Sequence, residues 1–476
     1  MQIRFETAGC RLNQIESESA ARFFVDKSFS LSLEPLNAKS PVDSECVLCI
    51  VNTCSVTQKA EQKDRRIIRL CLEKCPNATI IVTGCYAQLA PKTILSMDLR
   101  IAVLPGQKKS RISEVPTILE KNISTFEPVK FAKLLNETLF SVDSKTFGKS
   151  ENAFKLSTDS FLAHSRSSIK IQDGCNNNCT YCTINKARGH SVSLEPNEVI
   201  QRVKKLEEVG QNEVVFTTVN IGQYSGEYNG KKINFAQLLK LCLEQTKNIS
   251  FRISSLYPEV VDDYFCSVIK DSRVCPHFHI SVQSGSDDIL KRMARRYSAQ
   301  DVVFACNKLR IAKENPFIAC DIITGFPGET EEDFYKTMQL CENCNFSWIH
   351  VFPYSERPGT LAASMKNKVP QFISGERAKK LSHWAENNKK AYIESCCGKV
   401  YDAILETVNH SLLFNVGEGT ATFHAVTENF LHCQITVPVA KYSSLRQGQR
   451  IKVKILRPLQ KGIEKGGETD CIAEFL

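Results

Sequence analysis

The chain has 476 residues, enough for about three domains of roughly 150 residues each. Its charged fraction of 24% and hydrophobic fraction of 42% are close to globular averages, which excludes collagen, a coiled coil and a disordered chain. No apolar run approaches the roughly 20 residues of a membrane helix, and residues 1–10 lack the apolar stretch of a secretory signal. We therefore expect a cytoplasmic protein that does not enter a membrane.

Charge and cysteine content narrow the functional classes. The 61 Lys and Arg residues outnumber the 52 Asp and Glu residues, and the net charge of +9 favours a polyanionic partner such as a nucleic acid. The 21 cysteines fall below the content of a secreted disulfide scaffold, so we expect free thiols in a reducing compartment. Metal or cluster ligation is then the leading question.

Residues 1–120 predict an N-terminal parallel α/β domain. Two apolar, strand-like runs at 46–54 and 79–85 flank a helical pattern at 59–75, and each run ends in a small turn that contains a cysteine. Residues 121–164 lose this periodicity and gain Ser, Asn and Lys. We expect an irregular linker or an edge hairpin there.

Residues 165–390 predict a partial barrel. Six strand-like runs begin at positions 168, 213, 250, 277, 317 and 348, and a helical pattern follows each of them. Six βα units rather than eight predict an incomplete barrel, and the chemistry of such a fold lies at the carboxyl ends of its strands.

The last part of the chain predicts a small β barrel at 391–460, followed by a C-terminal tail at 461–476. Its clearest strand pattern is the alternation of Ile451, Val453 and Ile455 with residues on the other face.

The sharpest motif is GCNNNCTYC at 174–182, which places Cys175, Cys179 and Cys182 directly after the first barrel strand. Three thiolates suit a [4Fe-4S] cluster because they leave one iron without a protein ligand, whereas a structural zinc site needs a fourth ligand. The open iron can bind the amino and carboxylate groups of S-adenosylmethionine, whose sulfonium a low-potential electron can cleave. A zinc knuckle with a distant fourth ligand is the alternative.

With Tyr181 before the third cysteine, this C-x3-C-x2-C motif resembles the radical S-adenosylmethionine (radical SAM) superfamily. The segments HISVQSGSDDILKRMARRY, DIITGFPGET and HVFPYSERPGT are similar to its methylthiotransferase branch. The resemblance implies the six-unit barrel, the cofactor, and contact between Tyr181 and the adenine of the cofactor. The chain departs from the branch at TINKARG, where a proline is usual, and at FTTVN, where a glycine is usual.

That branch carries a second cluster in its N-terminal domain, and three motifs here resemble its ligands. They are TAGCRLNQIES with Cys10, VNTCSVTQKAEQKDRRIIR with Cys54, and VTGCYAQ with Cys85. Each cysteine ends a strand-like run, so parallel pairing would bring all three to one edge of a sheet. The resemblance implies two [4Fe-4S] clusters, the second of which carries the sulfur or methylated sulfur to be transferred.

Other cysteine pairs compete for a metal, and a zinc pair among them is the alternative. We expect free thiols instead, because the odd spacing of Cys46 and Cys49 in a strand points their side chains to opposite faces. The closely spaced pairs are Cys46 and Cys49, Cys71 and Cys75, and Cys341 and Cys344.

Polar groups at the predicted strand ends are candidates for the cofactor pocket. Gln283 and Gly325 are the stronger candidates, while for Asn220 a loop-capping role is the alternative. Arg188 could pair with the cofactor or with a substrate anion, and an exposed arginine is the alternative.

The segment GTATFHAVTENFLHCQITV in the C-terminal barrel is similar to the TRAM domain, an RNA-binding module. Lys452, Lys454 and Arg457 would give it a positive face for phosphate groups, although charged strands that simply face water are the alternative. Phe423 and Phe430 could stack on bases or belong to the core.

Across nearly the whole chain, the motifs most resemble the MtaB type of methylthiotransferase. The resemblance implies that tRNA is the substrate and that carbon 2 of threonylcarbamoyladenosine, 3′ of the anticodon, receives a methylthio group. That carbon has no acidic proton and no leaving group, so general acid–base catalysis cannot break its C–H bond, whereas a radical route can. An electron-donor protein and an unidentified sulfur source are also implied, with the base flipped into a closed pocket between domains.

Two other functions stay open at this stage. The nearer one is the same chemistry on isopentenyladenosine in tRNA or on a ribosomal protein. The other is a metal-cluster scaffold that binds RNA without catalysis, which predicts no reductive cleavage of S-adenosylmethionine.

Overall fold

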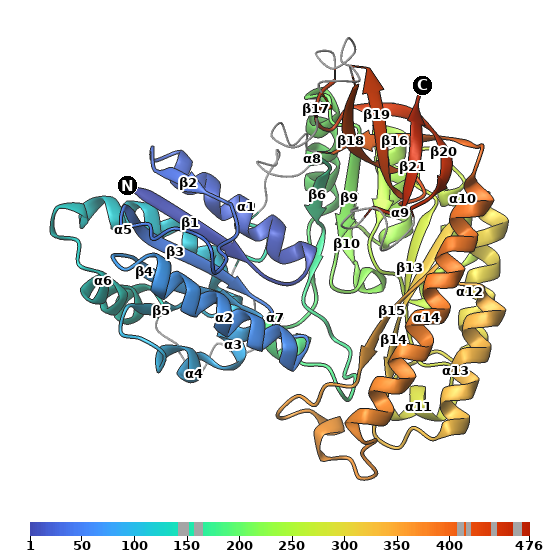
Figure 1. The fold of residues 1–476 in the computed structure, drawn as a ribbon, viewed down its shortest axis with the longest axis horizontal. Coiled ribbons are helices and arrows are strands. Elements are labelled where there is room, and N and C mark those ends of the chain that lie inside the picture. Colours follow the sequence, from blue (N-terminus) through green and yellow to red (C-terminus); the bar gives the residue numbers. More distant parts are fainter. Residues whose placement is uncertain (141–151, 157–164, 407–413, 416–419, 439–444, 460–468) are drawn as a thin grey trace.

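A computed structural model describes residues 1–140, 152–156, 165–406, 414–415, 420–438, 445–459 and 469–476. The N-terminal sheet lies beside a central partial barrel, and a small β barrel built from the end of the chain packs at one end of the central barrel (Figure 1). Among the helices of the described residues, none is both long enough and apolar enough to cross a membrane.

The N-terminal domain is a parallel sheet covered by helices on both faces. Its strand order is β2(Ser30–Ser32), β1(Gln2–Thr7), β3(Cys46–Thr53), β4(Thr79–Gly84), β5(Ile101–Val103). One face packs against α1(Arg11–Val25), and the other packs against α2(Gln58–Lys74). Because β3 is buried on both faces, it is almost continuously apolar. The predicted parallel α/β fold is confirmed.

The prediction of an irregular linker or hairpin at 121–164 is wrong for residues 128–140. This segment forms α6(Pro128–Leu134) and a π-helical turn at Leu135–Leu139, and Phe131, Leu135 and Leu139 pack into the N-terminal core. The helix begins where the Glu127 carboxylate accepts the N–H groups of Val129 and Lys130 at 3.0 Å. The parts of the predicted linker at 141–151 and 157–164 lie outside the described residues.

The central barrel has six parallel strands, as predicted from the six βα units. They form two three-stranded sheets, β6-β9-β12 and β13-β14-β15, which an isolated parallel bridge between Leu256 and Ile280 connects. The strands are β6(Ser167–Lys170), β9(Glu213–Thr217), β12(Ser250–Ile253), β13(His277–Gln283), β14(Phe317–Thr324) and β15(Trp348–Pro353).

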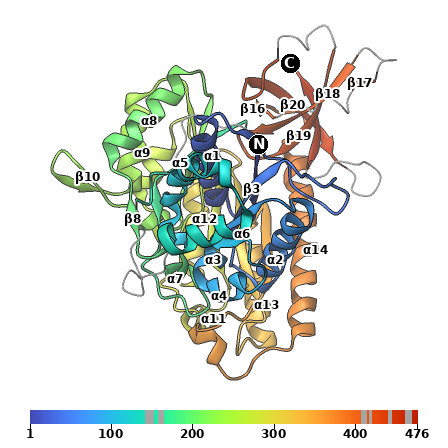
Figure 2. The same ribbon diagram turned by 90° about the vertical axis from the view of Figure 1, so that its left-hand side faces the viewer.

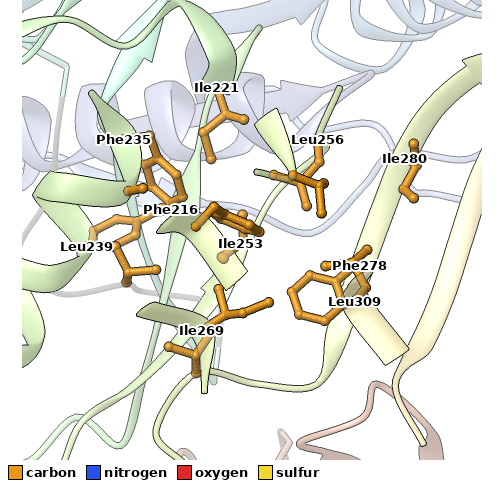
Figure 3. Close-up of a cluster of buried hydrophobic side chains, with 14 of the residues drawn as sticks. Phe216, Ile221, Phe235, Leu239, Ile253, Leu256, Ile269, Phe278, Ile280 and Leu309 are labelled. Carbon is orange, nitrogen blue, oxygen red and sulfur yellow. The ribbon is translucent and has the colours of Figure 1, made fainter. Parts of the chain in front are cut away.

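The helices of the barrel cover its outer face. Buried residues such as Phe216, Phe235 and Leu309 form the layer between strands and helices (Figure 3). The helices are α8(Pro196–Glu208), α9(Phe235–Gln245), α10(Asp263–Ile269), α12(Ala299–Ala312), α13(Glu331–Cys344) and α14(Gln371–Cys396).

The C-terminal domain is a closed β barrel. Five of its strands run in the order β16-β20-β21-β19-β18, and pairing of β16 with β18 closes the ring. They are β16(Val400–Leu405), β18(Thr420–Thr427), β19(His432–Pro438), β20(Arg450–Pro458) and β21(Cys471–Phe475).

The prediction of a tail at 461–476 is wrong for β21, which pairs with both β19 and β20. Its buried residues Cys471 and Ala473 alternate with less buried ones, but a strand of five residues is too short to stand out in the sequence. Residues 461–468 of the predicted tail lie outside the described residues.

Candidate cluster and cofactor site

The three barrel cysteines lie on the loop that follows β7(Gln172–Asp173). Cys175 is buried, and Cys179 and Cys182 are partly exposed. Thr180 anchors the loop between them, because its N–H donates to the Met293 carbonyl at 3.1 Å and its carbonyl accepts the Ala362 N–H at 2.9 Å. The motif therefore forms a fixed loop above the amino-terminal half of the barrel.

Several N–H groups point at the sulfur atoms of this loop. The backbone N–H of Asn177 lies 3.4 Å from the Cys175 sulfur, and that of Ile184 lies 3.5 Å from the Cys182 sulfur. The Asn220 side-chain amide approaches Cys175 at 3.9 Å. Donors around sulfur stabilise thiolate ligands and adjust the potential of an iron–sulfur cluster. The residues present therefore fit the group that the motif implies.

Burial opposes the thiolate form of these cysteines when iron is absent. Desolvation raises the pKa of the Cys182 thiol to about 12, and it does the same for Cys54 in the N-terminal domain. Iron supplies the positive charge that such buried thiolates need.

Asn220, Gln283 and Gly325 lie at or just after the carboxyl ends of β9, β13 and β14. Gln283 is buried and adopts a φ of 71°, which is uncommon for a residue with a side chain. A Cβ at Gly325 would lie 2.4 Å from the Ser374 side chain. The barrel thus brings these predicted pocket residues to the same end as the cluster loop. Whether they bind the cofactor stays a prediction.

Tyr181 lies in an aromatic group that contains one arginine. Its ring meets Phe326 edge to face at 6.2 Å, and its hydroxyl accepts a hydrogen bond from Arg295. The Arg295 guanidinium also lies 5.2 Å from the ring centre of Tyr257 and 5.8 Å from that of Tyr297. Sequence reasoning missed Arg295, although the run KRMARRY places it two residues before Tyr297.

The three N-terminal cysteines gather at the carboxyl edge of the N-terminal sheet, as predicted. Cys10 directly precedes α1 and is exposed, Cys54 follows β3, and Cys85 follows β4 as the first residue of α3(Cys85–Leu89). Gly9 makes room for them, because a Cβ at Gly9 would lie 2.5 Å from the Cβ of Cys54. The close approach requires glycine at this position.

Arg188, predicted to pair with the cofactor or a substrate anion, is buried in an ion network between the two domains. Its Nη1 donates to Glu16 on α1 at 3.1 Å and to Asp173 at 3.0 Å. Lys109 and Lys170 also donate to Glu16, at 2.5 Å and 2.9 Å. This excludes the exposed alternative for Arg188, and the other members of the network were missed.

Two further contacts bring the carboxyl edge of the N-terminal sheet to the barrel loops. Arg357, after β15, donates to Ser55 at 2.9 Å and pairs with Glu61, both close to Cys54 in the sequence. The α3 helix that begins at Cys85 packs against α7(Ile184–Arg188), which follows Cys182. The helices α3 and α7, which begin at or shortly after a cysteine of each set, therefore lie side by side at the junction of the two domains (Figures 1 and 2).

The positions of Phe423 and Phe430 in the C-terminal barrel do not favour stacking on RNA bases. Phe423 is buried, in agreement with a core role. Phe430 stacks on His277 at 4.1 Å, at the junction with the central barrel. Lys452 is exposed and pairs with Asp402 at 3.2 Å, so the basic strand does face solvent. RNA binding by this strand stays a prediction.

Two protein families match the two regions of the chain that contain the candidate cluster cysteines. Residues 169–341 match the radical SAM superfamily, and residues 2–106 match a family described as uncharacterized protein family UPF0004. The two matches cover the barrel with its cysteine loop and the N-terminal sheet with its three cysteines.

Several curated proteins are similar along most of the chain. The chain is 43% identical to the threonylcarbamoyladenosine tRNA methylthiotransferase MtaB of Treponema pallidum, over 85% of this chain and 91% of that protein. It is 35% identical to MtaB of Thermotoga maritima, over 85% of this chain and 86% of that protein. The tRNA-2-methylthio-N(6)-dimethylallyladenosine synthase of Anaplasma marginale is 28% identical, over 84% of this chain and 83% of that protein.

Solved structures agree on the fold. The radical S-adenosylmethionine methyltransferase TsrM of Kitasatospora setae superimposes with a TM-score of 0.50 at 12% identity, over 88% of this chain and 80% of that one. The enzyme OxsB gives a TM-score of 0.50 at 12% identity, and the match spans 80% of this chain but only 56% of OxsB.

Proposed function

We propose that this chain, which belongs to the MtaB family of radical SAM methylthiotransferases, adds a methylthio group to carbon 2 of threonylcarbamoyladenosine in tRNA. The observation that carries the proposal is the 43% identity to a protein of that name along 85% of the chain. The expected resemblance to this family is thereby confirmed. The identity to a dimethylallyladenosine enzyme is lower, at 28%.

The chain offers a set of three thiols for each of two clusters. Cys175, Cys179 and Cys182 would hold the [4Fe-4S] cluster that binds S-adenosylmethionine, and N–H groups already point at two of these sulfurs. With S-adenosylmethionine, such a cluster supplies the reductive cleavage that generates a carbon radical able to attack an unactivated C–H bond.

We assign the second cluster to Cys10, Cys54 and Cys85. The fit rests on their common position at one sheet edge and on the glycine that leaves room beside Cys54. Positive charge is also near, because Arg188 and Lys109 both act electrostatically on Cys85. In a [4Fe-4S] cluster, three thiolates leave one iron open for a sulfur atom.

A buried ion network would fix the position of one set of cysteines relative to the other. The network around Glu16 fixes α1, which starts at the first N-terminal ligand, against β6 and α7 of the barrel. Because these groups are buried, water is kept out of the junction. We infer that the tRNA base enters near this junction and that the C-terminal barrel binds the RNA backbone. An electron donor and a sulfur source are also required.

Analysis of modified nucleosides tests the substrate. Loss of the gene should remove 2-methylthio-threonylcarbamoyladenosine from total tRNA and leave its unmethylthiolated precursor. Return of the chain on a plasmid should restore the product. Loss of 2-methylthio-isopentenyladenosine instead, or an unchanged set of tRNA nucleosides with a changed ribosomal protein, would assign the other substrates.

Iron content and S-adenosylmethionine cleavage test the site. Anaerobically reconstituted protein should hold about eight irons, as expected for two four-iron clusters. Serine replacements at Cys175, Cys179 and Cys182 should remove about four irons and abolish cleavage of S-adenosylmethionine, whereas replacements at Cys10, Cys54 and Cys85 should remove about four irons and retain cleavage. If the reconstituted wild type does not cleave S-adenosylmethionine, the result would instead support a metal-cluster scaffold that binds RNA without catalysis.

A further inference from the structure

A second group of cysteines lies inside the N-terminal domain, away from both proposed clusters. The sulfur atoms of Cys46, Cys49 and Cys75 all lie within 4.8 Å of one another, and each of the three residues is fully buried. Cys71, one helical turn before Cys75, interacts with the Cys49 thiol, although its sulfur does not lie within 4.8 Å of all three of the others. We propose that these four cysteines bind one zinc ion.

The prediction that Cys46 and Cys49 point to opposite faces of a strand is wrong, and a β-bulge is the reason. Gln2 of β1 pairs with Cys46, but the next residue, Ile3, pairs with Leu48. Val47 is therefore an extra residue in β3, and it turns Cys46 to the same face as Cys49. Their sulfur atoms lie 3.6 Å apart.

The other two cysteines come from the end of the helix that returns along the same face of the sheet. After β3, the α2 helix runs back and ends at Lys74, which brings Cys75 to the start of β3. Cys71 lies one turn earlier, and residues four apart share one helix face. A C-x2-C pair on the strand thus meets a C-x3-C pair on the helix.

The sulfur spacing suits a single ion rather than a cluster. Zinc holds four thiolates tetrahedrally with bonds of about 2.3 Å, which puts the sulfurs about 3.8 Å apart. The Cys46–Cys49 separation of 3.6 Å is close to that value and far from the roughly 2.05 Å of a disulfide. Among the described residues, neither proposed cluster set is drawn together within 4.8 Å. A cluster spaces its ligands more widely because they bind different irons.

The surroundings suit a buried, negatively charged metal centre. Four thiolates and one Zn²⁺ leave two negative charges, and the Arg4 guanidinium on β1 interacts with Cys75. Arg4 Nε is buried and, within the described structure, has no hydrogen-bond partner. Buried thiol pairs elsewhere, such as Cys433 and Cys471 at 3.3 Å, lack a third nearby ligand among the described residues.

The position gives the ion a structural role. Cys49 lies five residues before Cys54 on an extended strand, so the zinc would be separated from the second cluster by about 15 Å. It would tie the amino end of β3 to the carboxyl end of α2, which are the two elements that lead to and from Cys54. The inference is independent of the substrate and of both clusters.

Zinc analysis of the full-length, cluster-loaded protein tests the proposal. After removal of loosely bound metal with a chelator, the wild type should retain about one zinc per chain, and zinc-edge X-ray absorption should show four sulfurs at about 2.3 Å. Cys49→Ser and Cys75→Ser should each lower the zinc content at least about fivefold without changing the iron content. Cys306→Ser is the matched control, since Cys306 is equally buried and its thiol forms a hydrogen bond with that of Cys344.

Three results would overturn the proposal. One is wild-type protein with far less than one zinc per chain, whether or not iron takes its place. Another is a zinc spectrum that contains nitrogen or oxygen ligands. The third is zinc that is lost in Cys54→Ser but kept in Cys49→Ser. The spectrum of the wild type decides the question even if the serine variants do not fold.

Discussion

The Glu16 carboxylate on α1 and the Arg188 guanidinium on α7 meet at 3.1 Å across the junction between the N-terminal domain and the barrel. Both side chains are buried, and Glu16 also accepts hydrogen bonds from Lys109 and Lys170. One carboxylate therefore balances charges that belong to both domains. Its loss would leave Lys109 without a carboxylate and leave Lys170 and Arg188 to share Asp173, which is more costly than the loss of a solvated ion pair.

Glu16→Gln should lower the free energy of unfolding by about 3–5 kcal/mol, because it leaves buried charges uncompensated. Urea denaturation followed by circular dichroism measures the change. Glu120→Gln is the control: its pair with Lys27, at 2.9 Å, is exposed, so the cost should stay below about 1 kcal/mol. Equal effects of the two substitutions would show that the network does not hold the domains together.

The same network predicts acid sensitivity. Burial raises the pKa values of Glu16 and Asp173, but attraction from Arg188 and the neighbouring lysines outweighs it, and both pKa values lie below their ordinary values of 4.5 and 3.8. A carboxyl group whose pKa is lower in the folded state stabilises the fold above its unfolded pKa and loses this contribution as pH falls.

The urea midpoint of the wild type should therefore decline as pH falls below about 4.5, the unfolded pKa of Glu16. Glu16→Gln should show a shallower decline over that range. His277, whose pKa burial lowers, also favours unfolding in acid, but it is present in both proteins. The difference between the two curves thus isolates the Glu16 contribution, and parallel curves would contradict the prediction.

Local sequence motifs identified the cysteine loop and the strand ends, because the ligands lie in short segments or directly follow apolar strands. The partners of Arg188 could not be predicted in this way. Glu16 is 172 residues away in the sequence, and only the docking of α1 against β6 and α7 brings the two together. A lone arginine at the end of a short helix carries no sign of such a distant partner.

The bulge in β3 shows a second limit of sequence reasoning. Alternation assigns Cys46 and Cys49 to opposite faces only if the strand is regular, and the extra residue appears solely in the pairing with β1. The same limit applies to β21, because its place between β19 and β20 depends on its partner strands rather than on its own five residues. Pairing between distant segments decided both cases.

Gly9→Ala should disrupt the second cluster selectively. An added Cβ would lie 2.5 Å from the Cβ and 2.8 Å from the sulfur of Cys54, at a φ of 94°. We expect iron content to fall by about four per chain while cleavage of S-adenosylmethionine persists. Gly210→Ala is the control, because Gly210 has a similar φ of 81° but open space around it. Full iron content in Gly9→Ala would argue against a cluster beside Cys54.

Arg295→Lys should weaken cofactor binding. Nε and Nη1 of Arg295 are buried without a hydrogen-bond partner in the described structure, beside Tyr181 and the cysteine loop, so they can receive an anionic group. Lysine keeps the charge but loses the planar fork that stacks on the tyrosines. We expect the KM for S-adenosylmethionine to rise about tenfold, equivalent to about 1.4 kcal/mol, with unchanged iron content.

The control for this substitution is Arg273→Lys, because Arg273 also uses its fork, in bonds to the carbonyls of Thr246 and Leu243, but on the outer layer of the barrel. It should leave the KM unchanged. A loss of iron in Arg295→Lys would instead make Arg295 a support of the cysteine loop, and an unchanged KM would exclude contact with the cofactor.

The basic strand β20 allows a test of RNA binding that is separate from the chemistry. Lys452 and Arg457 are exposed on it, so their replacement by serine should weaken tRNA binding mainly through lost phosphate contacts. The slope of log affinity against log salt should fall by about 1 for each lost contact, while cleavage of S-adenosylmethionine without tRNA stays unchanged. Lys308→Ser removes a partly exposed lysine, paired with Asp263, from α12 of the central barrel and should not alter the slope. If the control and the β20 variant gave the same slope, the C-terminal barrel would not be the surface that binds the RNA backbone.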